Sequence, residues 1–170
     1  MAVRRILTGD IPKLRVKSKK VRVFDKSLKK LIQDMLDTMR AANGLGLAAI
    51  QIGVPLRVIV IEMPPGEETN NKGKLYTLVN PEIAKMEGEE EGEEGCLSLP
   101  GIIGEVKRAA SVVVEAQTPN GKWVRVRAEG LLARAFQHEI DHLNGILFID
   151  RIEDPHKIHY IEQTELAQAI

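Results

Sequence analysis

The sequence has a single cysteine, no long apolar run and no excess of charge of either sign. Cys96 therefore has no partner for an internal disulfide, which is typical of proteins from reducing compartments. No apolar run approaches the roughly 20 residues of a membrane-spanning helix, and Thr8-Gly9-Asp10 interrupts the N-terminal stretch where a secretory signal has its apolar core. Lys+Arg and Asp+Glu number 24 each, so charge indicates neither a nucleic-acid nor a membrane partner. We expect a cytoplasmic protein.

The rest of the composition is that of a globular domain. Apolar residues make up 44% of the chain and charged residues 28%. A length of 170 residues is enough to bury one substantial core. Because no internal repeat or linker interrupts the pattern, we expect residues 1–170 to fold as a single domain.

Two segments have the periodicity of amphipathic helices. The first starts at Asp25, a suitable N-cap, and Gly44 is expected to close it. Its apolar residues recur every three or four positions, which defines one buried face. The second segment follows Gly130 and ends at Gly145. Its apolar stripe consists of Leu132, Phe136, Ile140 and Leu143.

Runs of β-branched residues and alternating patterns predict antiparallel strands at residues 56–62, 76–80, 112–114 and 122–128. Pro81 is expected to end the second of these strands. The dipeptide Asn120-Gly121 predicts a tight turn before the last one. A polar loop is expected at 64–73, between the first two strands.

The acidic stretch 82–94 is expected to be a solvated loop or an exposed strand, except for Glu94, which lies close to Cys96. A short strand at 145–149 and a last helix from Pro155 complete the prediction. The predicted fold is α+β, with antiparallel β-strands packed around a central helix that carries the most informative motif of the chain.

That motif is His138-Glu139-Ile140-Asp141-His142. Side chains four residues apart lie on the same face of a helix, so the two imidazoles point to one place. This arrangement suits two nitrogen ligands of a transition metal, with Glu139 beside them to accept a proton from metal-bound water. Two histidines on an exposed helix can also be idle, but the apolar stripe anchors this helix in the core and favours metal binding.

Cys96 is the candidate third ligand, because it lies in a turn-like segment next to Glu94. The common alternative for a free cysteine is a buried, inert thiol. Two histidines and one cysteine leave a fourth position for water, which is typical of catalytic metal sites. Hydrolysis of an acyl group also needs hydrogen-bond donors for the developing oxyanion. The side-chain amide of Gln51 and the backbone N–H of Leu97 are candidates.

Gln51 belongs to a stretch of small residues that begins Gly44-Leu45-Gly46. A dinucleotide site is excluded there, because the Gly-x-Gly follows a helix and the third glycine of that fingerprint is absent. Small residues let the backbone approach another chain closely, and a tightly packed turn is an equal alternative.

Three stretches together resemble the signature motifs of the peptide deformylases: Gly44-Leu45-Gly46-Leu47-Ala48-Ala49-Ile50-Gln51, Glu94-Gly95-Cys96-Leu97-Ser98 and Gln137-His138-Glu139-Ile140-Asp141-His142-Leu143. They follow one another in the order of that family, and the resemblance extends to about Asp150. It implies a metal-dependent hydrolase that removes the N-formyl group from the formyl-methionine of newly synthesised polypeptides. N-formyl-methionyl nascent peptides would be its partners, with transient ribosome association, and we expect a monomer.

The resemblance also implies roles for individual residues. Cys96, His138 and His142 would hold one divalent metal ion per chain, with Fe2+ as the native ion and Zn2+, Ni2+ or Co2+ able to replace it. Glu139 would act as general base and acid during attack by metal-bound water, while Gln51 and the Leu97 N–H bind the formyl oxygen. The substrate-binding positions, with His138 at the wall of the methionine pocket, would be Gly44, Leu45, Gly46, Leu131 and Ala135.

Some positions depart from the family pattern or invite a further role. Ile103 stands where some relatives have an arginine seven residues after the cysteine, which puts charge steering of the substrate in doubt but not the chemistry. Arg134 stands where some have an apolar pocket residue, so we expect its stem to line the pocket and its head to reach water. Glu94 and Asp141, with Arg108, are expected to support the ligands; the alternative is ordinary surface ion pairing.

Two other functions are compatible with parts of the sequence. The His-Glu-x-x-His pattern also serves metalloproteases, whose third ligand usually follows the helix. The groups available there are Glu153, His156, His159 and Glu162. That interpretation leaves Cys96 and Gln51 unexplained. A non-catalytic metal-binding module would need a closed fourth position, although Glu139 and Gln51 are both present.

Overall fold

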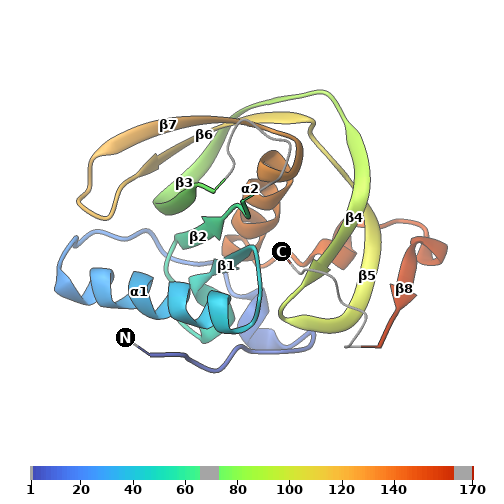
Figure 1. The fold of residues 1–170 in the computed structure, drawn as a ribbon, viewed down its shortest axis with the longest axis horizontal. Helices are drawn as coiled ribbons and strands as arrows, with labels where there is room; N and C mark the ends of the chain where they lie inside the picture. The colour runs from blue at the N-terminus through green and yellow to red at the C-terminus, as the bar shows by residue number, and fades with distance from the viewer. Residues whose placement is uncertain (1, 66–72, 163–169) are drawn as a thin grey trace.

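The computed structural model describes residues 2–65, 73–162 and 170. Within these residues the chain forms two antiparallel sheets and two α-helices, so the predicted α+β class with antiparallel strands is confirmed (Figure 1). The larger sheet, ordered β1-β2-β3-β6-β7, consists of β1 (Gly46–Ala48), β2 (Val58–Glu62), β3 (Leu75–Glu87), β6 (Ser111–Gln117) and β7 (Trp123–Glu129). The smaller sheet, ordered β4-β5-β8, consists of β4 (Glu90–Cys96), β5 (Leu99–Arg108) and β8 (Ile158–Tyr160). The helices are α1 (Lys26–Ala41) and α2 (Gly130–Leu143).

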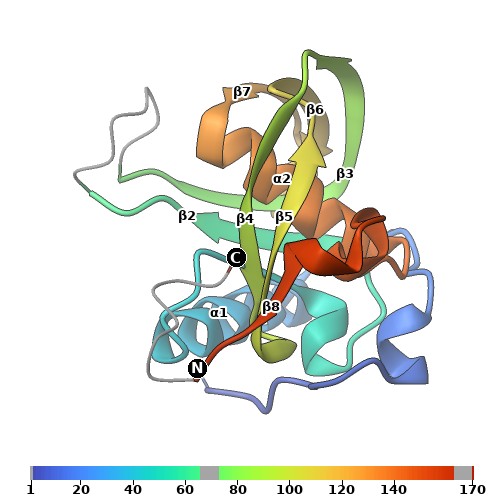
Figure 2. The same ribbon diagram turned by 90° about the vertical axis from the view of Figure 1, so that its right-hand side faces the viewer.

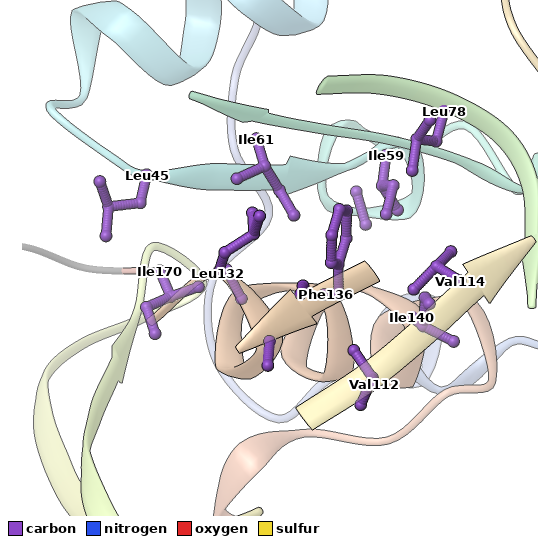
Figure 3. Close-up of a cluster of buried hydrophobic side chains, with 14 of the residues drawn as sticks. Leu45, Ile59, Ile61, Leu78, Val112, Val114, Leu132, Phe136, Ile140 and Ile170 are labelled. Carbon is purple, nitrogen blue, oxygen red and sulfur yellow. The ribbon is translucent and has the colours of Figure 1, made fainter. Parts of the chain in front are cut away.

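Strand β2 shows how the larger sheet separates the two helices. Ile59 and Ile61 pack in the core cluster that contains residues of α2, whereas Val58 and Val60 pack in the cluster that contains residues of α1. Successive side chains of a strand point to opposite faces, so a run of β-branched residues is apolar on both. Figure 3 shows the α2 side, where Ile59 and Ile61 face Phe136.

Helix α2 is enclosed by other elements. Every residue from Leu132 to Leu143 is buried, and the helix contacts β1, β2, β3, β6 and β7. Figure 2 shows the β4–β5 hairpin passing in front of it. The polar side chains of α2 therefore lack bulk water and need partners inside the protein. Gln137 illustrates this, because its amide accepts from the N–H of Ala109 and donates to the carbonyl of Ala109.

The acidic stretch 82–94 covers the end of β3 and most of β4, which is one arm of the β4–β5 hairpin. Glu90, Glu91 and Glu93 are exposed while Glu94 is buried, as predicted for an exposed strand with Glu94 excepted. The hairpin turns between Cys96 and Leu99, which are paired after a shift in register. The predicted turn at Asn120-Gly121 is confirmed, because β6 and β7 pair across it.

Two expectations for the first half of the chain are wrong. Pro81 does not end its strand: β3 continues to Glu87, and Pro81 lies at a shift in register where a proline needs no ladder hydrogen bond. The cap of the first helix also differs. Asp25 caps the N-terminus of α1 as predicted, but α1 ends at Ala41 and the residue with left-handed backbone is Asn43, not Gly44.

The region after α2 also differs from the prediction. Gly145 follows the helix with a positive φ as expected, but a 3-10 turn at Phe148–Arg151 replaces the strand predicted at 145–149. A second 3-10 turn, Pro155–Lys157, leads directly into β8, so no α-helix begins at Pro155. The expected helix would have continued into residues 163–169, which lie outside the described residues, as does most of the loop predicted at 64–73. None of the described helices has the length and apolarity needed to cross a membrane.

The N-terminal arm is held against α1 by Asp34. This buried carboxylate accepts hydrogen bonds from the backbone N–H of Ala2 and, at 2.9 and 2.6 Å, from the guanidinium of Arg4. Lys30 donates a further bond at 3.1 Å. The hydrogen bond from Arg4 outweighs burial and lowers the pKa of Asp34 far below its usual 3.8.

We predict that Asp34→Asn lowers the unfolding temperature at pH 7 and flattens its decline in acid. Because the pKa is lower in the folded state, the stabilisation is complete above the unfolded-state pKa and is lost as the pH falls through the folded-state pKa. Thermal unfolding from pH 7 to pH 2 measures this. Asp37→Asn, on the same helix, is the control, and equal acid profiles for both variants would contradict the assignment.

Candidate metal centre

The structure brings the three predicted ligands together. The ligand atoms of Cys96, His138 and His142 all lie within 4.8 Å of one another, and all three residues are buried. The sulfur of Cys96 is 3.3 Å from Nε2 of His142. Helix α2 supplies both histidines from one face, and the turn of the β4–β5 hairpin supplies the cysteine.

Unpartnered polar atoms indicate that this group suits a metal ion. Among the residues that the structure describes, Nε2 of His138 and both carboxylate oxygens of Glu139 are buried without a hydrogen-bond partner. Such atoms are costly unless something binds them. A thiolate and two imidazoles suit several divalent transition-metal ions, so the residues present fit the ion that the sequence implies.

Glu94 fixes the orientation of His138. One carboxylate oxygen lies 2.8 Å from Nδ1 of His138, which leaves Nε2 to face the cysteine and the second histidine. Arg108 donates two hydrogen bonds of 2.9 Å to the same carboxylate. A carboxylate behind a histidine ligand sets its tautomer and ring position. Phe148 stacks on the imidazole with ring centroids 6.1 Å apart, a contact that the sequence did not reveal.

Asp141 supports the site one step further away. Its carboxylate accepts from Arg108 at 2.6 Å and from Arg151 at 2.8 and 3.0 Å. The side chains of Glu94 and Arg108 are 0% and 4% exposed, so ordinary surface ion pairing is excluded. Asp141 acts through Arg108, whereas Glu94 contacts the histidine directly.

Arg134 does not behave as predicted. Its guanidinium is buried, donates to Glu94 at 2.7 Å and also donates to the carbonyls of Val106 and Glu90. The head therefore does not reach water. The reason is Gly92, where an added Cβ would lie 3.0 Å from the guanidinium carbon. The missing side chain leaves room for the arginine between α2 and the hairpin.

Burial affects the ionisable groups of the site in different ways. In Glu94, the hydrogen bonds from Arg108 and His138 outweigh burial and hold the pKa well below its usual range. In Glu139, burial outweighs the charges of His138 and Arg108 and raises the pKa to about 7. Burial lowers the pKa of His142, whereas the nearby Cys96 sulfur and the Glu94 carboxylate outweigh burial and raise the pKa of His138.

The glycines of the first motif allow close approach to the site. A Cβ on Gly46 would lie 2.5 Å from a carboxylate oxygen of Glu139, and one on Gly44 would lie 2.6 Å from a methyl group of Leu97. The backbone at the start of β1 therefore passes directly beside Glu139. These contacts lie within the chain itself, so they agree with the tightly packed alternative, and approach to another chain stays a prediction.

The side chain of Gln51 lies beside Cys96 and is held by two hydrogen bonds. Its oxygen accepts from the N–H of Ala48 at 2.9 Å, and its nitrogen donates to Ser98 at 3.0 Å and weakly to the sulfur of Cys96 at 3.7 Å. Ser98 belongs to the second motif, and no role is predicted for it from the sequence. Its hydroxyl fixes the direction of the Gln51 amide.

The residues expected to line a side-chain pocket also meet. Leu45 and Ala135 belong to one buried cluster, and Leu131 packs against its edge. Ile103 lies in the middle of the smaller sheet, paired with Gly95 and with His159. His159 and the exposed His156 lie outside the buried ligand group, so the described residues that follow α2 contribute no third ligand to it.

An α+β fold with a buried Cys-His-His group next to a buried, unpartnered carboxylate defines the class of the metallohydrolases. Comparison of the sequence with known proteins identifies the family within this class. The sequence model of the family described as polypeptide deformylase matches residues 3–157. A peptide deformylase from Thermomicrobium roseum is 52% identical over 172 residues, covering 99% of this chain and 98% of that protein.

Solved structures agree. A peptide deformylase from Legionella pneumophila superposes with a TM-score of 0.82 at 49% identity, covering 92% of this chain and 89% of that one. The Met-Ala-Ser-bound class I type b peptide deformylase from Acinetobacter baumannii gives a TM-score of 0.83 at 36% identity, covering 89% and 99%. The chain belongs to the peptide deformylase family, and the resemblance seen in its sequence is confirmed.

We predict that Glu94→Gln weakens metal binding about 10- to 100-fold, the usual effect of removing a partner behind a histidine ligand. Glutamine keeps the shape but loses the charge that faces Arg108 and Arg134. Competition with a chromophoric chelator measures the affinity. Glu93→Gln, the exposed neighbour on the same strand, is the matched control. Equal affinity of the two variants would show that Glu94 does not support the site.

Proposed function

We propose that Cys96, His138 and His142 hold one divalent ion and that Glu139 moves the proton when the chain removes the formyl group from N-terminal formyl-methionine. The observation that carries this proposal is the Glu139 carboxylate, which is fully buried, unpartnered and next in sequence to a ligand. Within this proposal, α2 is the central catalytic helix and residues 1–170 act as one catalytic domain. The match of the family over residues 3–157 supports that extent.

A divalent ion held by these ligands supplies Lewis acidity and makes water a nucleophile near neutral pH. Glu139 takes a proton from the attacking water as its oxygen adds to the formyl carbon. The carbon–nitrogen bond then breaks, Glu139 delivers the proton to the leaving amine, and formate and the free N-terminus are released. A pKa of about 7 suits a group that must both accept and donate this proton.

Two donors are proposed for the formyl oxygen, on which negative charge develops. Gln51 keeps its amide aimed past Cys96 because Ala48 and Ser98 hold its oxygen and nitrogen. One of its N–H groups makes only the long contact of 3.7 Å with the sulfur, so it can turn to an oxyanion at low cost. The backbone N–H of Leu97, in the turn of the hairpin, is the second donor.

The substrate is proposed to lie between two sheet edges. Strand β1 is an edge of the larger sheet and β4 an edge of the smaller one, and an extended peptide binds such edges through backbone hydrogen bonds. Because Gly44 and Gly46 lack side chains, the peptide backbone can approach β1 closely. The methionine side chain enters the pocket lined by Leu45, Leu131 and Ala135. The Acinetobacter relative binds Met-Ala-Ser, which supports a peptide that starts with methionine.

Other parts of the proposal concern the setting of the reaction. Ferrous iron is proposed as the native ion, with zinc, nickel or cobalt as substitutes, because thiolate and imidazole accept all of these. We further propose that the enzyme is a cytoplasmic monomer that acts during transient contact with the ribosome.

The experiment is formate release from formyl-Met-Ala-Ser by protein purified without oxygen, since ferrous iron and the cysteine are both open to oxidation. The expected result is turnover that falls by about 10²- to 10⁴-fold in Glu139→Ala, with the metal still bound. Glu129→Ala, an exposed glutamate before the same helix, is the control. Equal turnover in Glu139→Ala and Glu129→Ala would contradict the role of Glu139.

A further inference from the structure

Ile170, the last residue of the sequence, is buried beside the site. Its side chain is 3% exposed and belongs to the same core cluster as Leu45 and Ala135. Figure 3 shows Ile170 next to Leu132 of α2, on the side of the cluster where Leu45 lies. An aliphatic side chain from a distant part of the sequence thus lies among the residues proposed to receive methionine.

The backbone of Ile170 is also fixed. Its N–H donates a hydrogen bond of 3.1 Å to the carbonyl of Gly95. Gly95 immediately precedes Cys96 and lies on β4, an edge strand of the smaller sheet. A peptide bound in extended form along this edge would use the same backbone groups. Ile170 thus combines a backbone bond to the edge with a side chain in the pocket, as a bound substrate residue would.

We propose that Ile170 occupies the methionine pocket of its own chain and competes with the substrate, so that the protein inhibits itself in the resting state. This inference rests on the proposed function, because it requires that pocket to be the substrate pocket. Isoleucine and methionine are aliphatic side chains of similar size, so one excludes the other. A competitor tethered to the same chain acts at a high effective concentration, independent of the protein concentration.

An internal competitor raises KM and leaves kcat unchanged. Substrate binds only the fraction of molecules whose pocket is free, so KM is raised in inverse proportion to that fraction. Saturating substrate displaces Ile170, so kcat is unchanged. A pocket that is free in about a tenth to a third of the molecules raises KM roughly three- to tenfold.

The first test uses the full chain with Ile170→Asp, because a charged side chain does not enter an apolar pocket. The expected result is a KM for formyl-Met-Ala-Ser that is roughly three- to tenfold lower, with kcat unchanged. Ile170→Met, which keeps an aliphatic side chain, is expected to retain the original KM. Val3→Asp, the same kind of change at a side chain that is 65% exposed, controls for charge. A KM that is unchanged or raised in Ile170→Asp would overturn the proposal.

The second test does not depend on turnover. Calorimetry measures the binding of Met-Ala-Ser to the original chain and to Ile170→Asp, and the variant is expected to bind more tightly by the same factor. A synthetic amide of residues 165–170, Glu-Leu-Ala-Gln-Ala-Ile, is expected to weaken Met-Ala-Ser binding to the variant. The same peptide with Asp in place of Ile is expected to have no effect.

The outcomes separate this proposal from the proposed function. Tighter Met-Ala-Ser binding by Ile170→Asp without formate release in any variant would support the contact and refute the assigned reaction. Formate release with equal KM and equal binding in all variants would support the reaction and refute the contact. Absence of Met-Ala-Ser binding in every variant would overturn the pocket assignment and the contact together.

Discussion

The contact between Glu94 and His138 is the interaction on which the rest of the site depends. A carboxylate this deeply buried persists as an anion only because Arg108 and Arg134 hold it. It ties β4 to α2, and it turns Nε2 of His138 towards Cys96 and His142. Asp141 joins the same network through its ion pair with Arg108. Removing one partner of such a buried ion pair typically costs about 3–5 kcal/mol, so the network serves both the fold and the geometry of the ligands.

A second constraint is the closeness of backbone to the reacting groups. Gly46 has no side chain because Glu139 fills that space, and Gly92 has none because Arg134 does. The site consequently lies between two strand edges, and Glu139, the proposed proton-transfer group, packs against one of them. The same open edge on β4 accepts a hydrogen bond from Ile170. The edge proposed to receive a substrate strand thus already binds a residue of the chain itself.

The sequence predicted the site more completely than the fold around it. The spacing of His138 and His142 predicts that both imidazoles lie on one face of α2, because helical periodicity depends only on the local sequence. Strand β2 is predictable because it is apolar on both faces. The prediction ended strand β3 too early, at Pro81, because a register shift that accommodates a proline depends on the partner strand and not on local propensity. Arg134 was misjudged for a similar reason: its partners lie on a hairpin about 40 residues away. The position of Ile170 had no local signal at all.

The most direct test of the account is the protonation state of His138 in the zinc-loaded protein, measured by long-range proton–nitrogen correlation in nitrogen-15 NMR. The account predicts that Nδ1 carries a proton shared with Glu94 and that Nε2 has the chemical shift of a metal-bound nitrogen. Glu94→Gln should broaden or shift the Nδ1 signal while that of His142 stays in place. A metal-bound Nδ1, or an Nε2 that still carries a proton, would contradict the central role assigned to Glu94.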